Sequence, residues 1–452
     1  MKMEISSNTK DIFIQLYEQN KNSLSVGSPA IIKDLRSAAM EYFSSHGFPD
    51  KKDERYKYTF LENYFSNGYK KEFAPKKLNI NLKEIFNCDI PELNTHLILM
   101  VNGFYYNSTS SFQLEKGIKI CSLNDAFRVY PEIIEKYYSR SLTYDDSYIA
   151  LNSALFTDGY FIYVPKGVVM EKPIQVINIL ISDEDIMVQH RSLIVLEEGS
   201  QAKIVICDHT LSPAKFLTNS LLEVYTDESA ILDLVRVQNE HDESVQLTHS
   251  FINQEKSSKT NTGFITLHGG MVRNNLKVTM NGEHADNSSF GLFITDNSQH
   301  VDNYTYINHV KPNCTSNQFY KGLLNDNSTA SFNGRIVVGK GAQKTMAYQK
   351  SSTLLMSDHA RMNTRPQLEI YADDVKCGHG ATVGQLSEES MFYLQSRGIP
   401  EKEAKLLLTH AFAYEVIDKI KVDPLKDRID ELVNKRLRGE LSRCNNCMIH
   451  CC

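Results

Sequence analysis

The 452-residue sequence lacks any apolar run long enough to cross a bilayer, which takes about 20 residues as a helix. Its first residues, Met1 to Leu16, mix charged and polar side chains and contain no apolar segment typical of a signal peptide. No block of lysine and arginine stands out, and the formal net charge is −6. These absences predict a protein that binds neither membranes nor nucleic acid and is not exported.

Cysteine is also used sparingly. The odd total of nine, spread over a long chain, does not resemble the disulfide framework of a secreted protein and predicts a cytosolic location. We expect buried free thiols at four of these positions: Cys88, Cys121, Cys207 and Cys314.

Helical patterns occupy both ends of the chain. Near the start, apolar residues at helical spacing (Ile32, Leu35, Ala39, Phe43) follow Ser28-Pro29, which predicts an N-cap and a first helical position. After residue 387, Asp423-Pro424 predicts the start of a further helix, and Gly439 predicts its end.

Between about residues 95 and 385 the pattern changes to short β-branched runs separated by turns rich in Gly, Asn, Asp and Ser. Several turns place a small residue before a strand, as at Ala202, Ala230, Ala330 and Ala342, but at unequal intervals. This pattern fits a β-solenoid, a sandwich or a propeller and does not choose among them.

The most informative stretch is residues 369–398, where Cys377 and His379 are flanked by Gly378 and Gly380. A thiol and an imidazole at i and i+2 fall on the same face of a strand and suit iron, zinc or copper. The glycines allow a close approach to the backbone. Two ligands alone hold a metal weakly, so the pair predicts a shared or transient site.

This stretch closely resembles the SufB/SufD family of iron–sulfur cluster assembly proteins. The matching words are Tyr371-Ala372-Asp373-Asp374-Val375-Lys376-Cys377, His379-Gly380-Ala381-Thr382-Val383-Gly384, Phe392-Tyr393-Leu394 and Ser396-Arg397-Gly398-Ile399. The similarity runs from about residue 30 to 438. One departure is Tyr56, which stands where the family usually has tryptophan; this chain contains none.

The resemblance implies a mainly β fold with α: a right-handed parallel β-helix core flanked by helical N-terminal and C-terminal domains. The corresponding ranges are 1–95 for the N-terminal helical domain, 96–385 for the core, 386–440 for the C-terminal helical domain and 441–452 for a Cys-rich tail. We expect the helical domains to cap the two ends of the solenoid.

The resemblance also implies a non-enzymatic scaffold subunit that pairs with a SufB-like subunit and a SufC-like ATPase. It places His379, with Cys377 as the weaker candidate, at a transient iron or iron–sulfur site on the SufB interface, with no permanently bound cofactor. It places Phe392, Tyr393, Arg397 and Gly398 at the start of the SufC-binding domain. The isolated chain is a candidate homodimer.

Two features favour the SufD branch of the family. The SufB branch carries a cluster-building cysteine in the segment matching Gln349-Lys350-Ser351-Ser352, where this chain has none. The SufB branch also lacks the word formed by Lys376, Cys377, His379 and Gly380. The loop at Gly339-Lys340-Gly341 lacks the spacing of an ATP-binding P-loop, which fits a passive partner.

Other interpretations stay open on residues alone. A β-solenoid carbohydrate-active enzyme would need an export signal and an acidic groove. A polymerising β-helical protein would need uncapped ends. Asp373 and Asp374 are interpreted as an exposed turn pair or as partners of Lys376 or Arg365, and the scattered histidines as surface residues on turns. The tail cysteines Cys444, Cys447, Cys451 and Cys452 could hold zinc or a cluster, but we expect the tail to be dispensable because it lies outside the resemblance.

Overall fold

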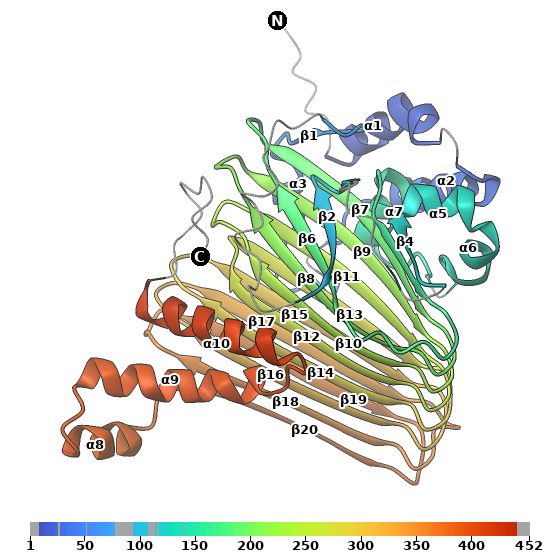
Figure 1. Cartoon of the computed structure of the whole chain (residues 1–452). Coiled ribbons are helices and arrows are strands. Elements are labelled where there is room, and N and C mark those ends of the chain that lie inside the picture. Colours follow the sequence, from blue (N-terminus) through green and yellow to red (C-terminus); the bar gives the residue numbers. More distant parts are fainter. Residues whose placement is uncertain are drawn as a thin grey trace, which may run out of the picture.

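In the computed structural model of the chain, the strands coil into a parallel β-solenoid made of two ten-stranded sheets (Figure 1). The structure describes residues 9–25, 28–50, 52–76, 94–106, 114, 117–140 and 142–440. Helices precede and follow the solenoid. The predicted fold class, a parallel β-helix with helical segments at both ends, is therefore confirmed.

From β5 to β20, successive strands alternate between the two sheets, which we call the odd sheet and the even sheet after the numbers of these strands. The earlier strands β1 and β4 belong to the odd sheet, and β2 and β3 to the even sheet. The odd sheet contains β1 (Lys70–Lys71), β4 (Lys119–Ser122), β5 (Tyr160–Val164), β7 (Ile186–Leu196), β9 (Phe216–Thr226), β11 (Val245–Gln254), β13 (Met271–Met280), β15 (His300–His309), β17 (Thr329–Val338) and β19 (Arg361–Ile370). The even sheet contains β2 (His96–Val101), β3 (Phe104–Tyr106), β6 (Ile174–Leu180), β8 (Gln201–Thr210), β10 (Ile231–Asn239), β12 (Lys259–His268), β14 (Asp286–Thr295), β16 (Thr315–Leu324), β18 (Met346–Leu355) and β20 (Lys376–Gly384).

The coil length explains why the sequence shows no clean repeat. Ile231 pairs with Lys259, 28 residues on, whereas Thr315 pairs with Met346, 31 residues on. Each coil contains one strand of each sheet, so consecutive turns in the sequence belong to opposite corners. Because the corners vary in length by a few residues, the number of residues per coil is not constant and the sequence shows no regular repeat.

Helices cover much of the outer surface of both sheets. The N-terminal set packs on the odd sheet around β5 to β13. It comprises α1 (Thr9–Leu24), α2 (Ala30–His46), α3 (Glu62–Phe65), α5 (Leu123–Val129), α6 (Pro131–Tyr137) and α7 (Ser147–Leu155). Three of these, α5 to α7, lie within the range 96–385. The solenoid interior covers one face of β7 and β9, and the N-terminal helices cover the other. Both strands are therefore buried along their whole length.

The C-terminal helices are α8 (Glu388–Ser396), α9 (Glu401–Ile417) and α10 (Asp423–Arg438). The prediction that they cap the end of the solenoid is wrong: α9 and α10 fold back along the outer face of the even sheet (Figure 1). Val416, Ile417 and Ile429 pack there against Val235 and other apolar side chains. The reason is that the outer face of strands β8 to β16 is itself apolar and has to be covered. The last coil is left open.

Helix ends follow the local chemistry closely. α10 begins at Asp423 and ends at Gly439, whose φ of +75° is left-handed, as expected for a glycine cap. α2 begins one position later than predicted, with Pro29 rather than Ser28 at the N-cap. None of the described helices combines the length and the apolar character needed to cross a bilayer.

The histidines differ from the prediction of surface residues. His284 is exposed, but His190, His241, His249, His268 and His309 are buried. His300 is largely buried as well, with Nε2 2.9 Å from Thr59 Oγ1 and Nδ1 2.7 Å from Thr329 Oγ1. Except for His241, which lies in the turn after β10, these buried residues lie on strands, and their burial depends on what packs against each face of the strand.

Candidate functional site at the open end of the solenoid

Cys377 and His379 lie on β20, the last strand of the even sheet, which pairs with β18. Cys377 is opposite Ala347, and His379 is opposite Gln349. Because side chains alternate along a strand, both belong to the same face, as their spacing predicted. This face is the interior of the solenoid, since Cys377 packs against the inner apolar cluster that contains Ala347.

The two side chains differ in environment. Partial burial raises the pKa of the Cys377 thiol, and a hydrogen bond with the backbone of Ala347 lowers it by less. The thiolate is the form that binds metal, so a metal at Cys377 must first displace the proton. His379 is exposed, and a neutral imidazole binds iron without that step.

Gln318, Gln349 and His379 lie side by side on the neighbouring strands β16, β18 and β20, on the face that lines the interior of the solenoid. Gln318 is opposite Gln349, and both side chains are buried. Gln318 Oε1 accepts a hydrogen bond of 2.6 Å from Thr305 Oγ1. Within the described residues, Gln318 Nε2 and both polar atoms of the Gln349 amide have no partner. A buried unpaired polar group costs roughly 1–3 kcal/mol, so a polar group brought next to His379 would be stabilised here.

Gly334 makes room for this amide. A Cβ at position 334 would lie 1.9 Å from Gln349 Nε2. Sequence reasoning did not identify Gln349 as a site residue, although it singled out residues 349–352 as the segment that carries a cysteine in the SufB branch. The register explains the connection, because Gln349 to Ser352 pair directly with His379 to Thr382.

Gly378 and Gly380 face the outside of the even sheet, beside an open hollow of about 520 Å³ that Phe319, Tyr348 and Lys350 also line. A Cβ at Gly380 would meet nothing within 4 Å, and one at Gly378 would come no closer than 3.8 Å to the Tyr348 ring. The described chain itself therefore does not require glycine at these two positions. The backbone of β20 is open to approach from outside.

Two family models match the chain. Residues 179–412 match the core domain of SufBD proteins of the SUF system for FeS cluster assembly, and residues 7–176 match the SufBD N-terminal region. The chain belongs to the SufBD family. The match to the core domain includes Cys377, His379 and the last coil of the solenoid.

Known members of the family are similar in sequence to this chain over most of its length. The iron–sulfur cluster assembly protein SufD of Escherichia coli is 28% identical over 87% of this chain and 90% of its own. SufD of Bacillus subtilis is 24% identical over 91% of this chain and 95% of its own. A SufBD family protein of Synechocystis, slr0076, is 28% identical over 90% and 91% respectively.

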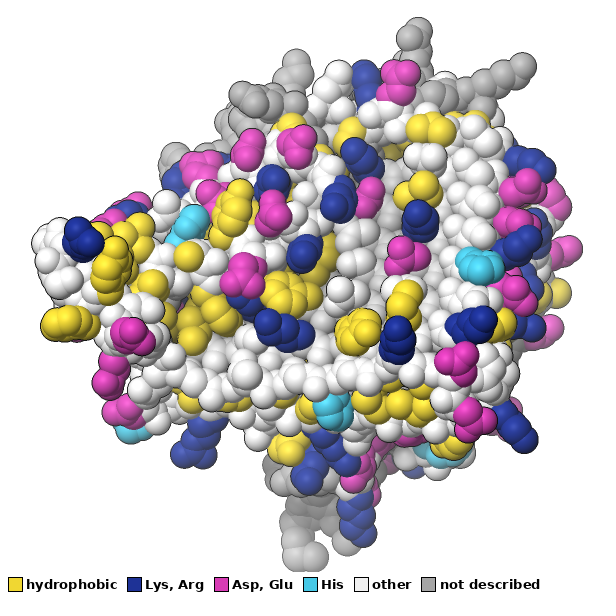
Figure 2. All heavy atoms as spheres, turned by 90° about the horizontal axis from the view of Figure 1, so that it is seen from below, with side chains coloured by type: hydrophobic (Ala, Val, Ile, Leu, Met, Phe, Trp, Pro, Cys, Tyr) yellow, Lys and Arg dark blue, Asp and Glu magenta, His cyan; other side chains and the backbone are white. Residues whose placement is uncertain are grey.

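In this SufBD protein the last coil exposes apolar side chains as well as strand edges. Within the described residues, β19 and β20 each pair on one side only. Large exposed apolar residues on or next to this coil are Met346, Tyr348, Ile370, Tyr371 and Val383. Figure 2 shows the molecule from below, with apolar side chains exposed among charged ones of both signs. An exposed edge of this kind is suited to pairing with another sheet.

Helix α8 carries the other exposed apolar surface. It begins at the Ser387 cap, whose hydroxyl accepts from the Ser390 N–H, and none of its residues is buried. Phe392 is 72% exposed and Tyr393 is 57% exposed. The Arg397 guanidinium lies 5.3 Å from the Tyr393 ring, and Gly398 turns the chain with a φ of +85°. The four predicted partner-binding residues thus lie together on one short helix and its end.

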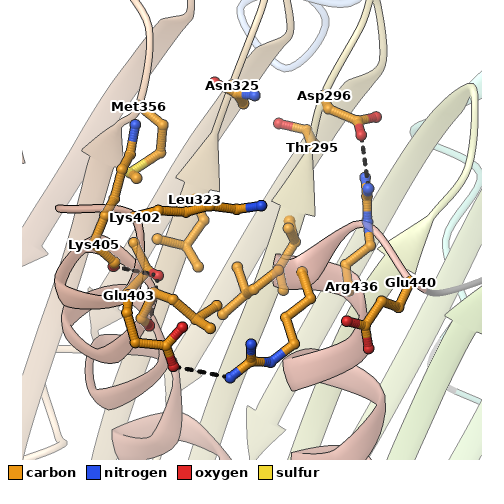
Figure 3. Close-up of a pocket in the computed structure, with 15 residues that line it drawn as sticks. Thr295, Asp296, Leu323, Asn325, Met356, Lys402, Glu403, Lys405, Arg436 and Glu440 are labelled. Atoms are coloured by element: carbon orange, nitrogen blue, oxygen red, sulfur yellow. Dashed lines mark hydrogen bonds and ion pairs between the residues drawn. The ribbon is translucent and has the colours of Figure 1, made fainter. Parts of the chain in front are cut away.

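Ion pairs and hydrogen bonds join α10 to the even sheet and to α9 (Figure 3). Arg436 pairs with Asp296 at 2.7 Å and donates a 3.0 Å hydrogen bond to the carbonyl of Leu267. Arg438 pairs with Glu403 at 3.1 Å, which links α10 to α9. Helix α8 precedes α9 and, unlike α9 and α10, has no buried residue.

The remaining candidate residues have structural roles or lie elsewhere. Asp373 and Asp374 are exposed in the turn before β20, and Arg365 pairs with Glu54 instead. Cys207 and Cys314 are buried and form no disulfide within the described residues, as predicted, and Cys121 is partly buried. Cys88 and the tail cysteines Cys444, Cys447, Cys451 and Cys452 lie outside the described residues. In the part of the chain that the structure describes, no three His, Cys, Asp or Glu side chains are placed to hold a metal ion.

Proposed function

We propose that this chain is a non-catalytic scaffold subunit of the SUF machinery that pairs with a SufB-like subunit through its last coil. The observation that carries the proposal is the position of His379: it lies on the edge strand of an uncovered coil, next to the unpartnered amide of Gln349. A partner strand added beside β20 would bring its own side chains to this point.

The cluster is cargo in this proposal rather than a resident group. His379 and Cys377 supply two ligands, while iron–sulfur and zinc sites usually take four. The remaining ligands would come from the partner subunit, so iron or a nascent cluster is held only in the assembled complex. The raised pKa of the Cys377 thiol makes His379 the stronger ligand of the two.

The second partner is a SufC-like ATPase, bound at α8 and the adjoining face of α9. Support comes from the exposed rings of Phe392 and Tyr393 and from the firm attachment of α9 and α10 to the sheet. Through that attachment, a force applied at α8 would reach the solenoid. We also propose a cytosolic location, supported by the four described cysteines, none of which forms a disulfide with another described cysteine.

Anaerobic co-expression with SufB-like and SufC-like partners tests the proposal. We expect one complex that contains all three chains and carries iron and sulfide. The His379→Ala variant should assemble the same complex with much less of both. His359→Ala is the matched control, because His359 is exposed in the turn between β18 and β19. Failure of the unaltered chain to join either partner would refute the assignment.

A further inference from the structure

A separate recess of about 420 Å³ lies on the outer face of the odd sheet, where the N-terminal cover ends. Its floor consists of outward-facing side chains of β11, β13, β15 and β17, and Arg55, Asp145 and Asp146 form part of its wall. None of these residues belongs to the site at the open end. The volume is within the range of small-molecule sites, roughly 300–1,000 Å³.

The floor side chains form two adjacent rows set by strand register. His249, Asn275 and Tyr304 lie side by side in one row, and Phe251, Lys277, Tyr306 and Arg335 in the next. Neighbouring strands are about 4.8 Å apart, so the two rows span an area large enough for a fused ring. Aromatic and cationic groups therefore alternate across one flat surface.

Lys277 is the cation at the centre of this surface. Its ammonium lies 5.7 Å from the Tyr306 ring centroid and 5.9 Å from that of Phe251, and it forms no ion pair with a described carboxylate. Arg335, by contrast, is paired with Glu369 at 2.6 Å, and Arg55 with Asp53 at 2.7 Å. Lys277 is thus the cation of the recess that is available to an added anion.

The first row contains buried polar atoms without a partner. His249 is only 2% exposed, and its Nε2 has no hydrogen bond within the described residues. The same holds for Oδ1 of Asn333, which is opposite Tyr304 at the other end of the row. Burial lowers the pKa of His249 to about 4, so its ring is neutral and adds no charge to the floor of the recess.

Arg273 keeps the recess in shape without being available to a ligand. It pairs with Asp302, donates a 2.8 Å hydrogen bond to the carbonyl of Arg55 and lies 4.2 Å from the Tyr56 ring centroid. The wall segment around Arg55 is therefore fixed to the sheet. A preformed recess binds a ligand without first ordering a loop.

We propose that this recess binds a small planar aromatic anion. The phosphate or carboxylate of the ligand pairs with the Lys277 ammonium, and its ring lies on Tyr306 and Tyr304. Charge-assisted hydrogen bonds and ring stacking supply the affinity. The position of the recess, apart from β20 and α8, leaves it open to a ligand in the assembled complex that we propose.

Fluorescence titration with 1-naphthyl phosphate tests this assignment. The chain contains no tryptophan, so the naphthyl emission can be followed with little protein background. Inorganic phosphate and 1-naphthol serve as half-ligands. We expect 1-naphthyl phosphate to bind at least about tenfold more tightly than either half, since each half makes only part of the contacts.

Three variants locate the binding. Lys277→Gln should weaken 1-naphthyl phosphate by about tenfold or more and leave 1-naphthol unchanged. Tyr306→Leu should weaken both naphthyl compounds. Lys256→Gln, which removes an exposed ammonium paired with Glu228 outside the recess, should change nothing. Lys277→Arg retains the charge and should retain binding.

Equal binding of all three probes, or equal loss in the Lys277→Gln and Lys256→Gln variants, would overturn the proposal. So would the absence of saturation up to about 1 mM 1-naphthyl phosphate, a concentration that corresponds to weak affinity. If Lys277→Gln does not fold, as judged by its Tm, the contrast between Lys277→Arg and Tyr306→Leu decides the question.

Discussion

Gln349 and His379 are directly opposite each other on β18 and β20, although 30 residues separate them in the chain. The amide of Gln349 is buried without a hydrogen-bond partner among the described residues, whereas His379 is exposed. A buried polar group therefore adjoins an accessible ligand at an open edge of the solenoid. This arrangement supports the proposed site at the last coil, shared with a partner subunit.

Replacement of His379 by alanine should reduce cluster formation more than any other single change at this end. The fold should persist, because the side chain is exposed and packs little. Cys377→Ser should have a smaller effect, since the thiol has a raised pKa and contacts the inner apolar cluster. Iron and sulfide per complex provide the measurement, and the Tm of each variant separates a lost ligand from a lost fold. Wild-type iron in the His379→Ala complex would contradict this role.

Binding of the ATPase should depend on the exposed rings of α8. The double variant Phe392→Ser with Tyr393→Ser removes apolar surface that is more than half exposed, so the free chain should keep its Tm. Its affinity for the ATPase should fall by about tenfold or more, as for aromatic anchors of an interface. Removing all of α8 to α10 is a poorer test, because it would expose the apolar face of the even sheet. Unchanged co-purification of the double variant would place the surface elsewhere.

The isolated chain should pair with itself through the same edge. Val383 is exposed on β20, and a charge on an edge strand discourages sheet pairing. We expect a concentration-dependent dimer in sedimentation experiments and a shift toward monomer for Val383→Lys. Lys172→Glu, at an exposed position before β6 and several coils away from β20, is a control for altered charge. A dimer unaffected by Val383→Lys would mean that another surface is used.

Stability should depend on pH through Glu240. Burial, followed by the nearby Asp208 carboxylate, raises the pKa of Glu240 to about 8, so the folded state binds a proton that the unfolded state releases near pH 4.5. The stabilisation is complete below about pH 4.5 and is lost as the pH rises toward 8, at up to about 1.4 kcal/mol per pH unit. Glu240→Gln should remove this loss. The difference in unfolding free energy between the two proteins at pH 5 and pH 8 is the measurement, and parallel curves would contradict the prediction.

Interior packing should be intolerant at Gly291. A Cβ there would lie 2.4 Å from ring atoms of Tyr320 on the neighbouring strand, and that ring is almost fully buried. Gly291→Ala should therefore destabilise the fold by about 1–3 kcal/mol through overpacking. Gly341→Ala is the control, because a Cβ at Gly341 would meet nothing within 4 Å. Equal midpoints of denaturant unfolding for both variants would show that the Tyr320 ring can move.

The sequence by itself determined the local features. Strand alternation placed Cys377 and His379 on one face, cap chemistry placed the start of α10 at Asp423 and its end at Gly439, and the family words indicated a β-helix. These features depend on residues close together in the chain, whose geometry is fixed by backbone dihedrals and side-chain periodicity.

Only the tertiary structure decided which coils lie side by side and what covers them. The register that puts Gln349 next to His379 depends on corner lengths that vary along the solenoid, and no local pattern encodes it. The same is true of α9 and α10, which look like an end cap in sequence but cover the apolar outer face of the even sheet. It is true too of His249, which a turn-like surface position would suggest is exposed but which lies buried in a recess assembled from four strands. Burial depends on what the rest of the chain places against a residue, and that is decided when the hydrophobic surfaces of distant segments pack together.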